Sequence, residues 1–174
     1  MISDPFYHNR SLTTLELSRN NLEDSGIKLL CEGLRDPGCT LQWLELYDCG
    51  VTSSGCDDLR SILINNRSLT TLELSRNNLE DSGIKILCEG LRDPGCTLQW
   101  LRIWNCKGTL WCCDDLSSVI STNRTLTSLE ITLDDDKKMS ESEERRCCEV
   151  LRNAGFSVDR RIGGGWDVSI HRRR

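Results

Sequence analysis

The chain has 174 residues, a formal net charge of −5, 37% hydrophobic residues and 11 cysteines. This acidic balance argues against sequence-independent binding to nucleic acid, which needs basic surface. No stretch approaches the ~20 apolar residues of a membrane span, and residues 1–10 lack the apolar segment of a signal peptide. The composition therefore predicts a folded protein with no membrane association.

The dominant feature of the sequence is an internal repeat. Residues 12–22 fit the pattern L-x-x-L-x-L-x-x-N-x-L, and the same residues stand at 69–79. Residues 9–43 recur 57 positions later as residues 66–100, with a single leucine-to-isoleucine difference. Related leucine patterns stand halfway between the copies, so one unit has about 28 residues, within the range of leucine-rich repeats. Residues 1–8 match no repeat and are expected to form a lead-in.

Each unit predicts a strand, a turn and a helix. Alternation over 12–17 turns the leucines inward and side chains such as Glu16 outward. Apolar residues over 27–34 recur at helical spacing, so a helix follows, and Asp24 and Ser25 are expected to cap it. An Asp-Pro-Gly sequence then ends this helix. Strand, crossover helix and parallel strand repeat with one hand, which predicts a solenoid.

One position after each strand is expected to support the turn. It holds Asn20, Cys49, Asn77 and Cys106 in successive units. Backbone groups between stacked coils are out of reach of water, and an asparagine side chain has the donors and the acceptor that can satisfy them. These four residues are predicted to form a structural ladder along the turns.

The repeats lose regularity toward the C-terminus. Residues 9–133 are predicted to be leucine-rich repeats, and 134–162 an irregular terminal repeat and cap. Within the latter, the charged run 134–138 predicts an exposed loop, and 156–158 a short strand. Residues 163–174 are predicted to form a glycine-rich and basic tail.

The cysteines are interpreted as structural. Most recur at equivalent positions of successive units, which is typical of small buried residues rather than of disulfides, and reduced thiols indicate the cytosol. In the adjacent pairs at 112–113 and 147–148, one cysteine is assigned to the helix face and the other to the surface. Their spacing does not predict a metal site. The aspartate pairs at 57–58 and 114–115 are assigned to solvated helix starts, so no catalytic group, metal or cofactor is predicted.

The predicted architecture is an α/β leucine-rich-repeat horseshoe with parallel strands on the concave face and helices on the convex face. Adjacent strands lie about 4.8 Å apart, so Trp43 and Trp100 are expected roughly 10 Å from each other with Thr71 between them. Aromatic residues rimmed by charges are typical of a protein-binding surface. The predicted partner-binding residues are Glu16, Trp43, Glu45, Tyr47, Glu73, Trp100, Arg102, Trp104 and Glu130.

The alternation of two unit types resembles the ribonuclease-inhibitor-like class of leucine-rich repeats. The segments 81–91, 94–99 and 112–123 resemble, more narrowly, the C-terminal repeat region of NACHT-, leucine-rich-repeat- and pyrin-domain proteins of the NLR family. The resemblance implies a cytoplasmic innate-immune receptor of the inflammasome type, with the repeats acting as a ligand-sensing or autoinhibitory module. It implies a protein partner, including intramolecular contact with a nucleotide-binding domain, for which this chain has no phosphate-binding loop.

Two other functions are consistent with the same residues. A free-standing protein resembling ribonuclease inhibitor would use the acidic arc against a basic target. A structural scaffold would instead associate with itself through the face that the first unit leaves uncovered. Both are binding or structural roles, and an enzyme is not predicted.

Overall fold

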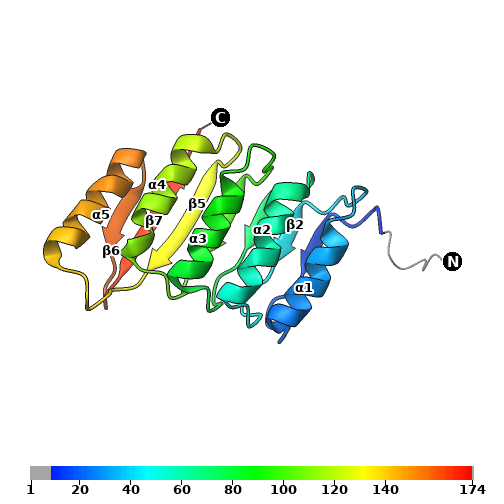
Figure 1. The fold of residues 1–174 in the computed structure, drawn as a ribbon, viewed down its shortest axis with the longest axis horizontal. Helices are drawn as coiled ribbons and strands as arrows, with labels where there is room; N and C mark the ends of the chain where they lie inside the picture. Colours follow the sequence, from blue (N-terminus) through cyan, green and yellow to red (C-terminus); the bar gives the residue numbers. More distant parts are fainter. Residues whose placement is uncertain (1–8, 174) are drawn as a thin grey trace.

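The computed structural model describes residues 9–173, which form a curved stack of strands and helices (Figure 1). The expected lead-in at residues 1–8 lies outside this range. Seven strands make one sheet in the order β1-β2-β3-β4-β5-β7-β6. Its five parallel strands, one from each repeat, are β1 (Thr14–Glu16), β2 (Trp43–Glu45), β3 (Thr71–Glu73), β4 (Trp100–Ile103) and β5 (Ser128–Leu133).

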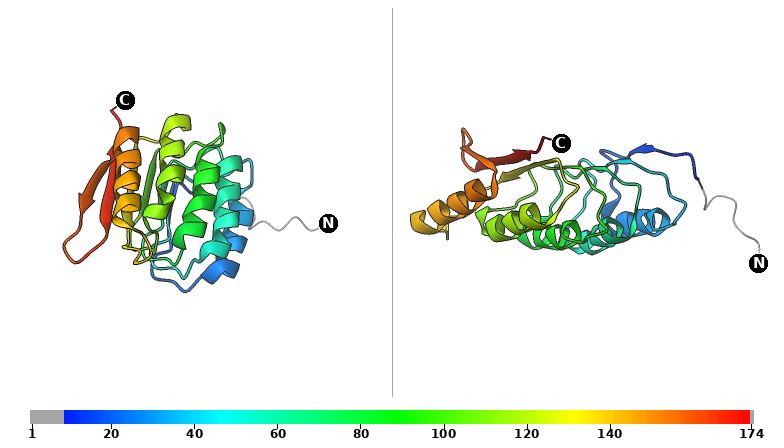
Figure 2. Two further views of the ribbon diagram at one scale, coloured as in Figure 1. Left: turned by 60° about the vertical axis from the view of Figure 1, so that its left-hand side comes forward. Right: turned by 90° about the horizontal axis from the view of Figure 1, so that it is seen from above.

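The helices all lie on one side of this sheet, on the outside of the arc (Figure 2). The arrangement confirms the predicted horseshoe, with parallel strands facing inward and helices facing outward. Short 3-10 helices at Ser53–Gly55 and Leu110–Cys112 precede α2 and α4. The α-helices are α1 (Glu23–Leu34), α2 (Cys56–Asn65), α3 (Glu80–Leu91), α4 (Cys113–Thr122) and α5 (Glu141–Ala154).

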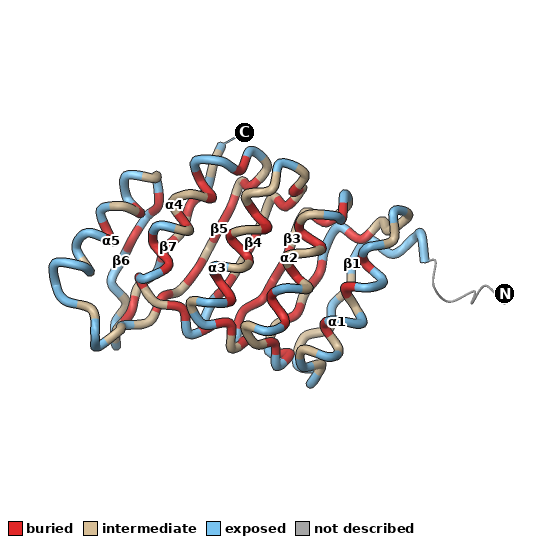
Figure 3. Tube along the Cα trace, viewed as in Figure 1, coloured by how far each residue is buried: buried red, intermediate tan, exposed pale blue. Residues whose placement is uncertain are grey.

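A continuous core runs between the sheet and the helices (Figure 3). Leu44, Leu72, Leu101 and Leu129 align across β2 to β5 and are fully buried. Each leucine buried in this way contributes roughly 1.5–3 kcal/mol. The second to fifth repeats contact one another through this row, and Leu15 of the first repeat, which is partly buried, packs against its end.

The turn residues lie between successive coils. The Asn77 side chain donates to the Leu46 and Leu74 carbonyls at 2.8 Å and accepts from the backbone N–H groups of Cys49 and Val51. The cysteines make the equivalent contact with their thiols. The Cys49 Sγ lies 3.2 Å from the Leu17 carbonyl, and the Cys106 Sγ lies 3.2 Å from the Leu74 carbonyl. In contrast, within residues 9–173 the side chain of Asn20 in the first repeat bonds to carbonyls of its own turn alone.

The expected helix caps at Asp24 and Ser25 are wrong. Helix α1 begins after Leu22 and has no side-chain cap. The Asp24 carboxylate reaches into the next repeat, where it accepts from the backbone N–H of Thr52 at 2.8 Å and from its hydroxyl. The helix start faces the neighbouring coil, and the unpaired donors available there belong to Thr52. This aspartate therefore links two repeats instead of closing one helix.

The last coil is covered by an antiparallel hairpin. Strands β6 (Ser157–Arg160) and β7 (Trp166–His171) pair with each other, and β7 pairs antiparallel with β5. The three glycines at 163–165 all have positive φ and form the connecting turn. Part of the predicted tail is thus a strand of the main sheet, and the short strand expected near 156–158 is present.

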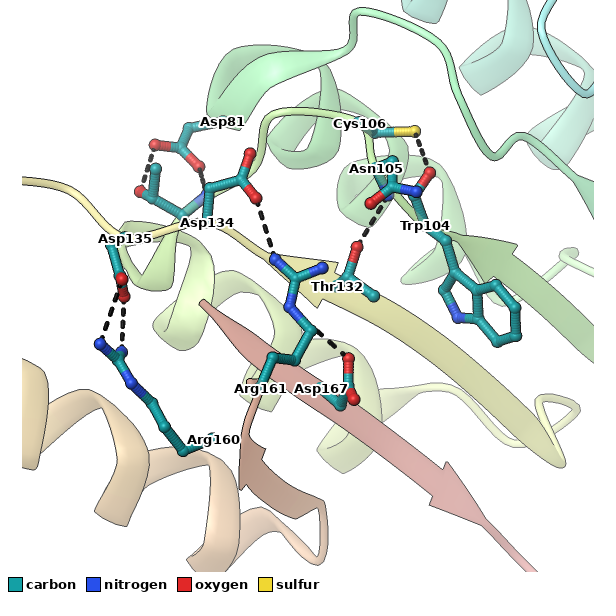
Figure 4. A network of polar contacts seen from close by, with 11 residues as sticks. Asp81, Trp104, Asn105, Cys106, Thr132, Asp134, Asp135, Arg160, Arg161 and Asp167 are labelled. Carbon is teal, nitrogen blue, oxygen red and sulfur yellow. Dashed lines mark hydrogen bonds and ion pairs between the residues drawn. The ribbon is translucent and has the colours of Figure 1, made fainter. Parts of the chain in front are cut away.

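Charged contacts fasten this hairpin to the loop that follows β5 (Figure 4). Arg160 forms a bidentate pair with Asp135, and Arg161 lies 3.1 Å from Asp134. Helix α5 between them begins with a capping box at Ser140. The charged run expected as an exposed loop therefore has specific partners in the cap.

Both members of each adjacent cysteine pair are buried, so the expectation that one would lie near the surface is wrong. Cys112 ends the 3-10 helix that precedes α4, and this tighter turn directs its thiol to 2.9 Å from Asp81 Oδ1. Cys148 lies on the side of α5 that borders Trp166 of the hairpin. The second cysteine of each pair is covered by structure that helical spacing alone does not predict.

A candidate protein-binding site on the concave face

The sheet register sets the outward side chains in rows. One row runs Thr14, Trp43, Thr71, Trp100 and Ser128 across β1 to β5. The next row, two positions along each strand, consists of Glu16, Glu45, Glu73, Arg102 and Glu130. Because the strands are parallel and in register, the repeat period alone determines these rows.

Trp43 and Trp100 stack on each other across Thr71. Their ring centroids lie 6.2 Å apart with an interplanar angle of 23°. Strand spacing alone places the two positions roughly 10 Å apart, so both side chains lean over the small threonine. Trp43 remains 42% exposed. A large aromatic surface is therefore held rigidly and open to solvent.

Arg102 joins the other aromatic residues of this face. Its guanidinium lies 4.6 Å from the Trp100 ring centroid and 4.3 Å from that of Trp104. It also pairs with Glu130 at 3.1 Å and contacts Glu73 at 3.7 Å. Cation–π attraction and two carboxylates hold the arginine between the two tryptophans.

Glu73 and Ser75 form the polar floor of the site, and both are buried. The Glu73 carboxylate accepts from the Ser75 backbone N–H at 2.6 Å. The Ser75 hydroxyl accepts in turn from the Trp104 backbone N–H at 2.9 Å. These hydrogen bonds fix the end of β3 against the start of the Trp104 turn.

The predicted residues omit two arginines that lie beside Tyr47. Arg19 and Arg76 each place the guanidinium 5.7 Å from the Tyr47 ring centroid. Both occupy turns with positive φ, so the alternation of the strands does not predict their direction. A basic residue directly before the asparagine position of both copies is the signal that could have found them.

Seven of the nine predicted residues line one hollow of about 600 Å³. Glu16 and Glu130 lie in the same row beyond its two ends. A second hollow of about 410 Å³ adjoins it beyond Trp104, and strand β7 supplies Asp167 and His171 to its wall. The first hollow is lined by Ser18, Arg19, Trp43, Glu45, Tyr47, Glu73, Ser75, Trp100, Arg102 and Trp104.

The cysteines lie beneath this surface. Burial raises the pKa of the Cys88 and Cys106 thiols to about 12, so both are protonated at neutral pH. Over residues 9–173, no cluster of His, Cys, Asp or Glu has the arrangement of a metal site. In the same range, no helix is long and apolar enough to cross a membrane.

Parallel strands, outer helices and a ladder of turn residues define the class as a leucine-rich-repeat protein. A family model described as leucine-rich repeat matches residues 8–31 and 65–88. Among solved structures, the leiomodin-1 actin-binding site 2 shares the fold, with a TM-score of 0.63 and 16% identity over 84% of this chain and 82% of that one.

Within this class, the chain is homologous to the repeats of the NACHT, LRR and PYD domains-containing proteins. It is 41% identical to protein 14 of Mus musculus over 152 residues, covering 87% of this chain and 15% of that protein. Protein 14 of Homo sapiens is 46% identical over 131 residues, which are 75% of this chain and 12% of that protein. Protein 3 of Bos taurus is 50% identical over 128 residues, which are 74% of this chain and 12% of that protein. The chain thus spans a small part of these relatives.

Proposed function

We propose that the chain is a non-catalytic recognition module that binds a protein partner in the concave hollow. The observation that carries this proposal is the Trp43–Trp100 stack, a rigid and exposed aromatic surface rimmed by charged side chains. Tryptophan, tyrosine and arginine dominate binding energy in protein interfaces, and all three types line this hollow. Their fixed geometry reduces the entropy lost on binding.

Homology supports a particular setting for this module. We propose that it acts in the cytosol, as the ligand-sensing or autoinhibitory repeat region of an NLR-type innate-immune receptor or of a protein derived from one. In the autoinhibitory case, the concave face contacts a nucleotide-binding domain. The support is the 41–50% identity to NACHT, LRR and PYD domains-containing proteins.

Peptide selection on the whole chain tests the proposed binding surface. Random displayed peptides are selected on the wild-type chain and then measured on the Trp43→Ala/Trp100→Ala double variant. We expect at least a tenfold loss of affinity, with an unchanged far-UV circular dichroism spectrum. Trp111→Ala is the matched control, since Trp111 is 45% exposed but lies outside the hollow. Selection that yields no peptide dependent on Trp43 and Trp100 would show that the concave face is the wrong surface.

Self-association is a second candidate, favoured by the apolar face of the first repeat. Leu12 is 39% exposed, whereas Leu69, which has the same sequence context, is 3% exposed. The difference arises because the second repeat covers the third, while in residues 9–173 nothing covers the first. A second copy of the chain would bury this face. Light scattering over a range of concentrations tests it. A strict monomer at about 1 mM, where even an association of roughly −4 kcal/mol would populate the dimer, removes this candidate.

A further inference from the structure

The fourth repeat contains an arginine site that is already filled by the chain itself. Arg102 lies between the Trp100 and Trp104 rings, and Glu73 and Glu130 on the two neighbouring strands contact its guanidinium. The structure therefore shows how this concave face holds a guanidinium group: an aromatic face and carboxylates from adjacent strands act together.

The second repeat has the same framework with no cation at its central position. Trp43, Glu45 and Tyr47 precede Trp100, Arg102 and Trp104 by one 57-residue period. In this unit the central position holds a carboxylate, and the neighbour in register on β1 is a second carboxylate, that of Glu16. Like charges directly opposite on adjacent strands destabilise a sheet. Within residues 9–173 no ion pair involves Glu16 or Glu45.

An aromatic face is open beside these two carboxylates. Trp43 stacks on Trp100 toward β3, and on the β1 side the residue in register is the small Thr14. The hydroxyl of Ser18 donates to Glu45 at 2.7 Å and orients that carboxylate. The open tryptophan face, the oriented Glu45 and Glu16 thus form a site of the kind that Arg102 occupies one period later.

We propose that Trp43, Glu16 and Glu45 bind an arginine side chain of the protein partner. This inference rests on the proposed function and specifies the chemistry of its ligand. A guanidinium is planar, stacks on an indole and forms paired hydrogen bonds to a carboxylate, whereas an ammonium group lacks this geometry. Arginine therefore fits the site better than lysine does.

The same reasoning explains why Tyr47 is not the principal contact. Arg19 and Arg76 each lie 5.7 Å from its ring centroid, so cations of the chain already accompany this residue. The partner's arginine approaches from the β1 side of Trp43, where Glu16 and Glu45 are the charged residues of the register row.

The test uses peptides selected on the wild-type chain that depend on Trp43. Each arginine is replaced in turn by citrulline, which keeps the planar shape and removes the charge, and by lysine. We expect one arginine in each peptide at which citrulline weakens binding at least tenfold and lysine weakens it less. The same loss is expected for unmodified peptides on Glu16→Gln/Glu45→Gln. Glu32→Gln/Glu141→Gln is the control with equal net charge, since both residues are exposed on helices.

A third variant places a guanidinium of the chain itself in the proposed site. In Glu45→Arg, the new guanidinium has Glu16 and Glu73 on the neighbouring strands, as Arg102 has Glu73 and Glu130. We expect this variant to fold and to lose peptide binding at least tenfold. If it does not fold, the glutamine variants decide. Peptides that require Trp43 but tolerate citrulline and the glutamine variants overturn this inference alone. The absence of any Trp43-dependent peptide overturns the proposed function and this inference with it.

Discussion

Asn20 and Asn77 occupy the same position of two repeats that share their sequence, yet they make different contacts. The Asn77 side chain bridges the second and third repeats with hydrogen bonds to both, whereas among residues 9–173 the Asn20 side chain bonds to carbonyls of its own turn alone. Asn77 is buried and Asn20 is exposed. Comparing the two asparagines therefore separates the stability that comes from contacts with the preceding repeat from the stability that comes from contacts within one turn.

Asn77→Ala is expected to destabilise the protein by about 3 kcal/mol or more, because it leaves several buried backbone groups without partners and each costs about 1–3 kcal/mol. Asn20→Ala is expected to cost less than about 1 kcal/mol, since water can replace its contacts. Urea unfolding of both variants measures the difference. Equal losses in the two variants would contradict an inter-repeat role for Asn77.

Gly33 and Gly90 provide a second comparison, within helices that differ in sequence at a single position. A Cβ atom at Gly33 meets nothing within 4 Å, so Gly33→Ala is expected to stabilise the protein by about 0.5–1 kcal/mol through helix propensity. At Gly90 the new atom would lie 3.1 Å from Leu63 Cβ, and crowding offsets that gain. Thermal unfolding of the two variants should rank Gly33→Ala above Gly90→Ala. The reverse order would contradict the packing between α2 and α3.

Arg102→Lys is expected to keep most of the stability of the wild-type chain but to change the environment of the tryptophans. Lysine retains the positive charge between Glu73 and Glu130, and it lacks the planar group that stacks on Trp100 and Trp104. Intrinsic tryptophan fluorescence should shift to longer wavelength as water reaches the rings. Arg146→Lys, at an exposed ion pair with Asp114, is the control and should leave the spectrum unchanged.

Stability is expected to fall as pH rises above about 9. Burial raises the pKa of Cys31, Cys56, Cys88 and Cys106 to about 12 in the folded protein, while an unfolded thiol titrates near 8.5. The folded state thus binds more protons between these values, so unfolding becomes easier with each step in pH. The contribution of these buried, protonated thiols to the free energy of unfolding is complete below pH ~8.5 and declines until pH ~12.

Melting temperatures between pH 8 and 11 measure this decline, and Cys88→Ala/Cys106→Ala should reduce its slope. A slope that is the same in this variant would contradict the assignment to thiols. At pH 8, a thiol reagent should modify Cys39 first, since it is the partly exposed cysteine, and reach the buried cysteines only after unfolding.

The repeat period predicts the concave rows because parallel pairing in register converts sequence offset directly into position. It does not predict how side chains lean. The approach of Trp43 to Trp100 depends on the small volume of Thr71 and on Arg102 beside them. A strand pattern determines which face a residue occupies, and its neighbours in space determine the contact.

Contacts between repeats were the least predictable part. Asp24 is of a residue type favoured at helix starts, but its carboxylate binds Thr52 of the next coil instead. The C-terminal hairpin illustrates the same difficulty. Alternation near Trp166 and Val168 is typical of a strand, and it carries no information on the strand's partner or direction. Both outcomes depend on segments distant in sequence, which local periodicity cannot describe.

Because β7 runs antiparallel to β5, further repeats can be added to the sheet on one side of β5 and not on the other. A further parallel coil cannot add beyond β7, because its strand runs the opposite way and its hairpin partner β6 already occupies the margin. Duplication of the 57-residue period must therefore lengthen the protein upstream of β5. Each such event would add two strands and one more aromatic pair to the inner arc, and it would leave the terminal hairpin untouched.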